Sequence, residues 1–246
     1  MESEIVTLGI CQEKARLKCI KKSTSEFKKL QAAFYEVFRI FNDAMQGIWN
    51  NYELIIQNEN GIHRILATLE DDEANNRKIF ESILSVFSLS LTPIKRLIFE
   101  GSYVSACTLL RANIEAMVQL RKVLRGQYKR RQTPRITEED ERIKRIYSKI
   151  TGLAHLSDDL YLSDVTKGHS SIENDELLTP LLRVLTPQFN HNLGEGLFSL
   201  HIACSVEIIF RINTYLETHI PSKKISSESL STLNECSKTA WSKISQ

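Results

Sequence analysis

The sequence has few of the residues that build turns: 9 glycines and 5 prolines among 246 residues. Sandwiches and barrels need many turns between short strands, so the composition disfavours both. The scattered glycines form neither a Walker loop nor a dinucleotide fingerprint, which disfavours nucleotide enzymes of those kinds. The net charge is only +2, from 32 basic and 30 acidic residues, so the whole chain has no general attraction to nucleic acid or membrane.

Common catalytic and metal-binding patterns are also absent. The six histidines form no His-Glu-x-x-His segment, and no pair of Glu-x-x-His segments indicates a di-iron bundle. Gly-x-Ser-x-Gly is missing, and no cysteine has a sequence neighbour that indicates nucleophilic catalysis. We therefore expect neither a metal site nor a cofactor.

The cysteines and the amino terminus indicate the compartment. The five cysteines are odd in number and include no Cys-x-x-Cys pair, which fits buried thiols in a reducing compartment. Glu2 and Glu4 stand where a secretory signal carries cations. The longest run without a charge, Ser82 to Ile94, has 13 residues and is too short to span a bilayer. We expect a cytoplasmic protein with no membrane partner.

Hydrophobic periodicity indicates helices throughout. From Phe27 to Ile56 apolar residues recur every three or four positions, which predicts one helix that begins after Ser25 and stops at residues 58–61. A helix of about 30 residues reaches about 45 Å and can serve as the spine of a bundle. No segment has the alternation that predicts a strand.

Further helices are predicted along the rest of the chain, and Thr92-Pro93 is expected to break one of them. We predict an all-α bundle of about five to seven helices with one long spine helix, in a single domain spanning residues 1–246. The domain has a core at about 25–220, an amino-terminal helix or arm at 1–24 and a polar carboxy-terminal helix at 222–246. The other helices are expected after Asp71, over 102–124, from Thr137 to near His155, and over 197–216.

One predicted helix carries polar residues among hydrophobic ones. The segment from Tyr103 to Leu124 is nearly apolar, yet Arg111, Glu115 and Gln119 follow one another at four-residue steps. This spacing places them on one helix face. Inside a bundle the arginine and the carboxylate must neutralise each other or bind a ligand, because buried charge is costly. The alternative is a partly solvated stripe with an ion pair within the helix.

The next long helix has a similar ridge. Tyr147, Thr151 and His155 are four residues apart, and His155 stands where the regular pattern stops. A histidine beside a polar loop is suited to proton transfer near neutral pH. The alternative is a helix-end histidine that binds a terminal carbonyl or complements the negative helix end.

A basic stretch lies between these two helices. Its seven cations have no acid among them, and Gln127, Tyr128, Gln132 and Thr133 add hydrogen bonding and one stacking ring, so a phosphate backbone is a reasonable partner. The alternative is a solvated helix hairpin facing the acids at 138–141. The candidate nucleic-acid-binding residues are Arg121, Lys122, Arg125, Lys129, Arg130, Arg131 and Arg135.

The two ridges also carry a family resemblance. Ser102-Tyr-Val-Ser-Ala-Cys, then Arg111-Ala-Asn-Ile-Glu115-Ala, then Tyr147-Ser-Lys-Ile-Thr-Gly-Leu-Ala-His155 resembles bacterial helical domains related to HEPN and AbiV-like abortive-infection proteins. The resemblance covers about Phe80 to Tyr161. It implies a cytoplasmic helical bundle with a role in phage defence or RNA metabolism. The HEPN ribonuclease pattern, an arginine and a polar residue followed by histidine after about four to six positions, is not present.

Two functions follow as hypotheses. In the first, the chain is a HEPN-like protein that binds RNA and cleaves it without metal: His155 moves a proton, Arg111 stabilises charge on phosphorus, and Tyr147 with Glu115 orients them. In the second, it is a helical scaffold or regulatory subunit that binds a protein partner or itself through apolar residues that the core does not need, such as Trp49, Tyr52 and Ile56. Whether the chain is an enzyme stays open between them.

Overall fold

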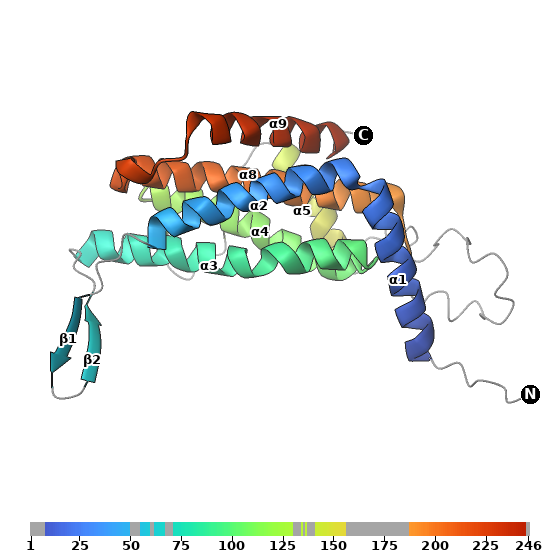
Figure 1. Ribbon diagram of the computed structural model, residues 1–246, viewed down its shortest axis with the longest axis horizontal. Coiled ribbons are helices and arrows are strands. Elements are labelled where there is room, and N and C mark those ends of the chain that lie inside the picture. Colours follow the sequence, from blue (N-terminus) through green and yellow to red (C-terminus); the bar gives the residue numbers. More distant parts are fainter. Residues whose placement is uncertain are drawn as a thin grey trace, which may run out of the picture.

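The computed structural model describes residues 8–49, 55–59, 62–66, 71–129, 134, 136, 141–155 and 187–244. Apart from one short β-hairpin, the fold they form is an all-α bundle, the predicted class (Figure 1). A 3-10 turn, η2 (Pro221–Lys223), joins the last two helices. The α-helices are α1 (Leu8–Glu26), α2 (Lys28–Trp49), α3 (Asp71–Phe99), α4 (Tyr103–Leu124), α5 (Glu141–Ala154), α8 (His191–His219) and α9 (Ser227–Ile244).

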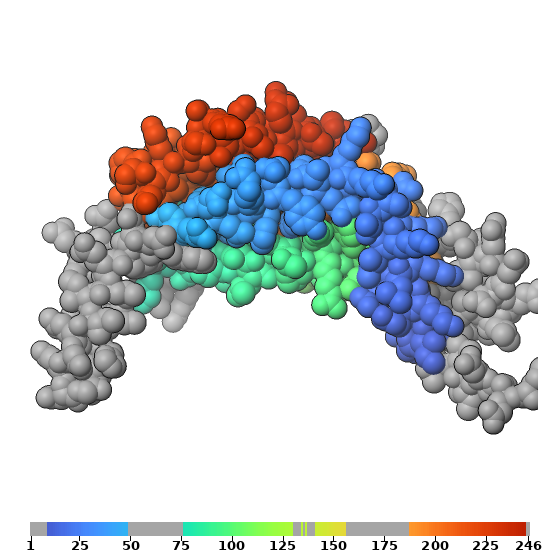
Figure 2. Space-filling view, in the orientation of Figure 1, coloured from blue at the N-terminus to red at the C-terminus, as the bar shows by residue number. Residues whose placement is uncertain are grey.

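Helix α8 lies at the centre of the bundle, where α2, α3, α4 and α9 all contact it (Figure 1). Every residue from Leu197 to Val206 is buried. A helix that is apolar on all sides is typical of a core helix. Figure 2 shows α9, α2 and α3 as neighbouring bands on one face of the molecule.

The predicted single spine is not confirmed. α3 and α8 are the longest described helices, with 29 residues each, whereas the predicted spine region forms α2 with 22. The chain turns at Phe27, whose ring is buried, and α1 leaves α2 at a steep angle (Figure 1). α2 then ends at Trp49, so the expected continuation of this helix to Ile56 is wrong.

A short antiparallel hairpin follows α2, although no strand was predicted. It pairs β1 (Ile55–Glu59) with β2 (Ile62–Leu66), with Ile56 opposite Ile65. Isoleucine is β-branched and favours extended backbone. In so short an apolar run, helical and strand periodicity cannot be told apart.

Pro93 lies inside α3 and does not break it, which corrects the prediction. Proline removes the N–H that would bond the carbonyl four residues earlier. That carbonyl belongs to Leu89, which is 77% exposed, so solvent can replace the lost donor. Leu91 and Ile94 on either side are buried and hold the helix against the core.

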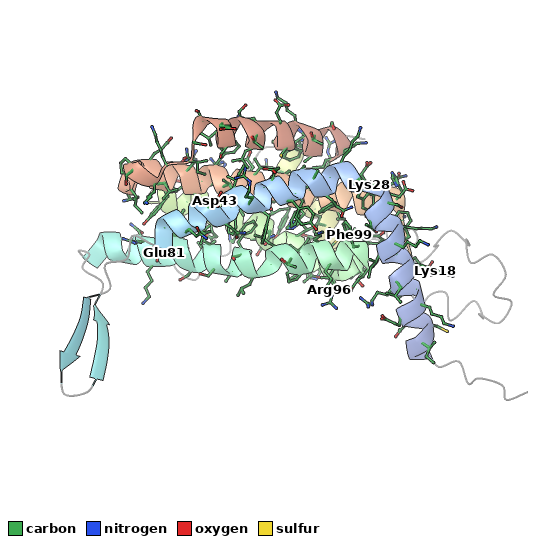
Figure 3. The ribbon with its side chains drawn as sticks, in the orientation of Figure 1. Lys18, Lys28, Asp43, Glu81, Arg96 and Phe99 are labelled. Carbon is green, nitrogen blue, oxygen red and sulfur yellow. The ribbon has the colours of Figure 1, made fainter. Side chains whose placement is uncertain are left out.

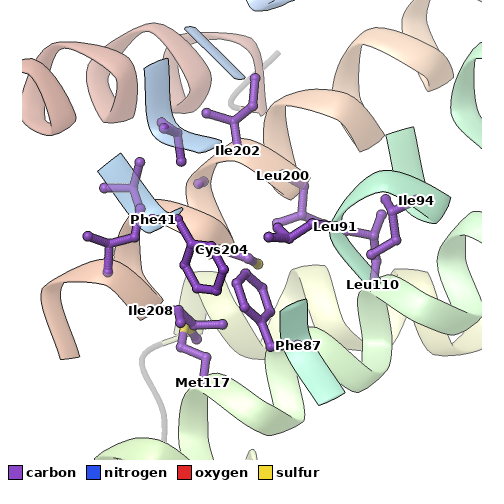
Figure 4. Packing of buried hydrophobic residues seen from close by; sticks show 14 of the residues in the cluster. Phe41, Phe87, Leu91, Ile94, Leu110, Met117, Leu200, Ile202, Cys204 and Ile208 are labelled. Atoms are coloured by element: carbon purple, nitrogen blue, oxygen red, sulfur yellow. The ribbon is translucent and has the colours of Figure 1, made fainter. Parts of the chain in front are cut away.

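The core is continuous and rich in aromatic rings. Phe41 of α2 and Phe87 of α3 meet edge to face, with centroids 5.5 Å apart (Figure 4). Phe80 and Tyr215 stack at 4.3 Å between α3 and α8. All five cysteines are free and buried, and burial raises the pKa of the Cys107 thiol to about 12. A thiol in that state is a poor nucleophile at neutral pH.

The turn between α3 and α4 is fixed by Gly101, whose φ is +78°. The Gly101 N–H donates to the Ile98 carbonyl and the Ser102 N–H to the Leu97 carbonyl, the two bonds of a Schellman ending. A Cβ atom at Gly101 would lie 2.9 Å from the Gln188 carbonyl oxygen. This position therefore requires glycine for both its backbone conformation and its close packing.

A buried carboxylate ties α1 to the same end of α3. Glu100 is 7% exposed and accepts hydrogen bonds from Arg16 of α1 at 2.6 Å and from Arg96 at 2.8 Å. Figure 3 shows Arg96 near the end of α3 that α1 approaches. Two guanidinium groups compensate the loss of hydration of this carboxylate.

Two described helices are long and apolar enough to cross a membrane, by length and composition only: Asn76–Phe99 and His191–His219. The second window is 72% buried inside the bundle, as expected of a core helix. Length and hydropathy alone are weak evidence for a membrane span, because core helices of soluble proteins have the same properties.

Candidate functional site

The candidate site lies on the packed helices α4 and α5, where polar side chains from both helices meet. On α4, the Arg111 Nε donates to the Glu115 Oε1 at 3.0 Å, one helical turn further on. This is the ion pair within one helix that the sequence spacing allowed. The two side chains are 30% and 25% exposed, so the pair lies at the edge of the bundle and not in its core.

Helix α5 adds two further groups to this pair. The Tyr147 hydroxyl donates to the Glu115 Oε1 at 2.6 Å and also accepts from the Arg111 Nε at 3.1 Å. At the end of α5, the His155 Nε2 lies 2.5 Å from the Arg111 Nη1. All four candidate residues therefore belong to one connected group. We call Arg111, Glu115, Tyr147 and His155 the polar cluster.

The electrostatics of the polar cluster keep its arginine charged. Hydrogen bonds to Tyr147 and Glu115 raise the pKa of the Arg111 guanidinium above its ordinary value. Burial, followed by the hydrogen bond to Glu115, raises the pKa of the Tyr147 phenol. The phenol thus stays protonated and continues to donate to the carboxylate at neutral pH.

The contact between Arg111 and His155 defines the state of the imidazole. A guanidinium has only donors, so the His155 Nε2 must be the acceptor and carry a lone pair. The proton of the neutral ring is then on Nδ1. His155 is exposed, and the Arg111 Nη2 has no hydrogen-bond partner among the described residues, so both groups can reach a ligand from solvent.

Thr151 occupies the ridge between Tyr147 and His155, as the spacing predicted. Its Oγ1 is buried and has no hydrogen-bond partner among the described residues. A buried hydroxyl without a partner is uncommon in folded proteins. Thr151 therefore adds an unused polar atom beside the polar cluster.

The basic stretch begins in the last turn of α4 with Arg121 and Lys122, both partly exposed. The helix ends in a second Schellman turn at Gly126, with φ +65°. Arg125 and Lys129 on either side of this glycine are exposed. Three of the predicted nucleic-acid-binding residues lie outside the described residues: Arg130, Arg131 and Arg135.

The structure also contains a pocket that the sequence did not predict, between α4, α5, α8 and α9. Arg142, Glu207, Arg211 and Trp241 line it together with Arg121. These residues come from four helices, and no spacing along one segment relates them. This group of lining residues could therefore be recognised only once the packing of the four helices was known.

Among the described residues, no group of three histidine, cysteine or acidic side chains could hold a metal ion. The polar cluster has one carboxylate and one imidazole, and a guanidinium occupies the place between them. Its donors and acceptors suit an oxyanion and a transferable proton. Comparison with known proteins gives no match to a family model, to a curated protein or to a solved structure.

Proposed function

We propose that the chain is a cytoplasmic RNA-binding protein, with a role in phage defence, whose polar cluster contacts the RNA backbone and can cleave it without metal. The observation that supports this most is the contact between Arg111 and His155, which come from different helices. An isolated ion pair within α4 would need only Arg111 and Glu115. The added phenol and imidazole give the groups that transfer of a proton and stabilisation of a phosphate require.

The chemistry assigns one task to each residue. The lone pair on the His155 Nε2 takes the proton of a ribose 2′-hydroxyl, and the freed oxygen attacks the adjacent phosphorus. A new bond from phosphorus to the 2′ oxygen forms, the bond to the 5′ oxygen breaks, and the leaving oxygen takes a proton from water. The products are a 2′,3′-cyclic phosphate and a 5′-hydroxyl. Arg111 donates to the phosphate oxygens as charge develops on them.

Glu115 and Tyr147 act as positioning residues. They hold the Nε of the guanidinium through hydrogen bonds of 3.0 and 3.1 Å, whereas its Nη1 contacts His155. When a phosphate binds, Nη1 exchanges His155 for a phosphate oxygen, and this exchange frees the imidazole lone pair. A guanidinium held at one edge loses less freedom on binding.

The basic stretch supplies general attraction to the strand. Arg125 and Lys129 are exposed beyond the end of α4, the helix that carries Arg111 and Glu115. Cations that neutralise phosphates release counterions, so the affinity should fall steeply as salt increases. The sequence-independent part of RNA binding is assigned to this stretch.

The test is cleavage of a labelled single-stranded RNA by purified full-length protein in the presence of a chelator. We expect cleavage by the wild type and at least about a hundredfold loss in Arg111→Ala and His155→Ala, because each removes a group that acts in the transition state. His219→Ala is the matched control, since His219 also ends a helix and is exposed. Intact RNA with the wild-type protein would refute the catalytic proposal.

A second candidate is the helical scaffold that binds itself. The side chains of Trp49, Tyr52 and Ile56, on which the sequence argument depended, lie outside the described ones. Val86 and Leu89 of α3, however, are 64% and 77% exposed and share one helix face. Exposed apolar residues on one face are typical of an interface.

Size-exclusion chromatography with light scattering separates the scaffold from the RNA-binding protein. The scaffold predicts a dimer that becomes a monomer in Leu89→Glu. Ile10→Glu on α1 is the control, because Ile10 is also an exposed large hydrophobic residue. A wild-type protein that is a monomer at all concentrations tested would contradict self-association.

A further inference from the structure

The pocket between α4, α5, α8 and α9 is lined by both apolar and charged residues. Its volume is about 380 Å³. Met117, Ile143 and Trp241 are among the apolar residues that line it. Pockets that bind small molecules are mostly apolar with a few convergent polar groups, and their volumes begin at about 300 Å³.

The lining also carries charged groups. Arg121, Arg142 and Arg211 line the pocket together with the carboxylate of Glu207. Guanidinium groups are the side chains that bind carboxylates and phosphates best, because their donors match the geometry of these anions.

Arg211 provides the second, independent observation. Its Nε is buried and has no hydrogen-bond partner among the residues that the structure describes. Its Nη2 donates to the Glu207 Oε2 at 3.3 Å, a long contact that occupies one donor. A buried N–H of a guanidinium without an acceptor is costly, and a bound carboxylate or phosphate oxygen would supply that acceptor.

Arg142 of α5, which also lines the pocket, is held in position by Trp241 of α9. Its guanidinium carbon lies 3.9 Å from the centroid of the Trp241 ring, and its Nη2 donates to the Trp241 carbonyl oxygen at 3.3 Å. These contacts fix the guanidinium of α5 against α9. A cation that is already positioned binds an anion with less loss of side-chain freedom.

We infer that this pocket binds a small organic anion, with a flat apolar body against Trp241 and Met117 and a carboxylate or phosphate on Arg211. The inference does not rest on the proposed action on RNA, because the polar cluster contributes no residue to the pocket lining. A carboxylate and a phosphate ester share the chemistry that a guanidinium recognises. The experiment includes both, and the tighter binder identifies the class of ligand.

The experiment is isothermal titration calorimetry on the full-length protein with 2-naphthoate and 2-naphthyl phosphate as probes. We expect at least one of them to bind with a Kd of about 10–100 μM, a range usual for ligands of this size. The neutral 2-naphthalenemethanol should bind at least about tenfold more weakly, because it cannot pair with Arg211. Inorganic phosphate should bind more weakly than 2-naphthyl phosphate because it lacks the apolar body.

Two variants of opposite sign test the assignment of residues. Arg211→Gln should weaken binding about tenfold or more, and Glu207→Gln should strengthen it severalfold by removing the competing carboxylate. Arg39→Gln is the matched control, since Arg39 pairs with Glu36 and Asp43 on α2 and does not line the pocket. Because Glu207→Gln is expected to raise the affinity for the probe, this variant remains informative even if Arg211→Gln fails to fold.

Three results would overturn the inference. The first is no binding of either anion at millimolar concentration. The second is equal affinity for the neutral analogue, which would show an apolar pocket without anion recognition. The third is binding that neither Arg211→Gln nor Glu207→Gln changes, which would place the probe elsewhere on the protein.

Discussion

The Nη1 of Arg111 and the Nε2 of His155 lie 2.5 Å apart, although the two residues are separated by 44 positions in the chain. Packing of α5 against α4 creates this contact, because Arg111 stands in the first half of α4 and His155 directly follows the end of α5. Glu115 and Tyr147 complete the group on the other edge of the guanidinium. The polar cluster is thus a property of the helix pair and not of either helix alone.

Removing a member of the polar cluster should change stability little. Arg111→Gln and Tyr147→Phe are each expected to lower the free energy of unfolding by less than about 1 kcal/mol, because partly exposed ion pairs contribute little. Chemical denaturation followed by circular dichroism measures this change. Phe198→Ala is the positive control, since loss of a fully buried ring should cost about 3–5 kcal/mol.

A large loss of stability in Arg111→Gln, equal to that in Phe198→Ala, would assign the cluster a structural role. A small loss leaves the four side chains without a sufficient structural explanation. Any effect of the same variants on RNA could then be attributed to the site itself.

Two glycines with the same backbone conformation should respond differently to substitution. Gly126→Ala should cost about 1–2 kcal/mol, the usual penalty for a left-handed residue with a side chain, because no atom of the described part of the chain lies within 4 Å of the added Cβ. Gly101→Ala should cost about 2–4 kcal/mol, since its Cβ would also meet the Gln188 carbonyl at 2.9 Å. Thermal or urea unfolding of the two variants measures the difference.

Equal losses in the two glycine variants would contradict the tight packing of the α3–α4 turn. The turn would then require a left-handed backbone only. Gly126→Ala provides the matched control because its φ is +65° against +78° at Gly101.

Acid should destabilise the protein through His201 of the central helix. Its Nε2 lies 3.0 Å from the Leu91 carbonyl oxygen, and complete burial lowers the pKa of the imidazole from 6.5 to about 4. Between these values the unfolded chain binds a proton that the folded protein does not, so stability rises with pH and is lost as pH falls below 6.5. The expected loss from pH 7.5 to pH 5 is about 2 kcal/mol from this group.

His201→Gln should remove that part of the pH dependence, because glutamine can still donate to the Leu91 carbonyl but does not titrate. The measurement is urea unfolding of both proteins at pH 7.5 and pH 5. His219→Gln, at the exposed end of the same helix, is the control for the loss of a histidine as such. An unchanged slope in His201→Gln would show that another group causes the acid sensitivity.

Helical periodicity predicted most of the fold, and its failures have local causes. The helix at 102–124, the one that ends near His155 and the one over 197–216 are all present. Pro93 was expected to break a helix, but its buried neighbours and the exposed position of Leu89 allow α3 to continue. At this position tertiary packing outweighs the low helix propensity of proline.

The central place of α8 could not be predicted, because length and amphipathic period indicate a spine helix at 27–56 instead. A helix buried on all sides has no single apolar face, so its periodicity is weak although its burial is the greatest. The spacing of Arg111 and Glu115 predicted their ion pair. The contacts of Arg111 with Tyr147 and His155 depend on how α4 and α5 pack, which spacing along the sequence does not show. The same holds for the pocket that Arg211 lines.

The most direct test of the central claim is a double-mutant cycle on the rate of RNA cleavage in chelator, with Arg111→Ala, His155→Ala and the combined variant. Residues that act as one unit in a reaction are not additive. We expect each single variant to be at least about a hundredfold slower than the wild type. We expect the double variant to be no slower than the slower single one. Losses that multiply, or a wild-type protein that leaves RNA intact, would contradict the joint action of Arg111 and His155.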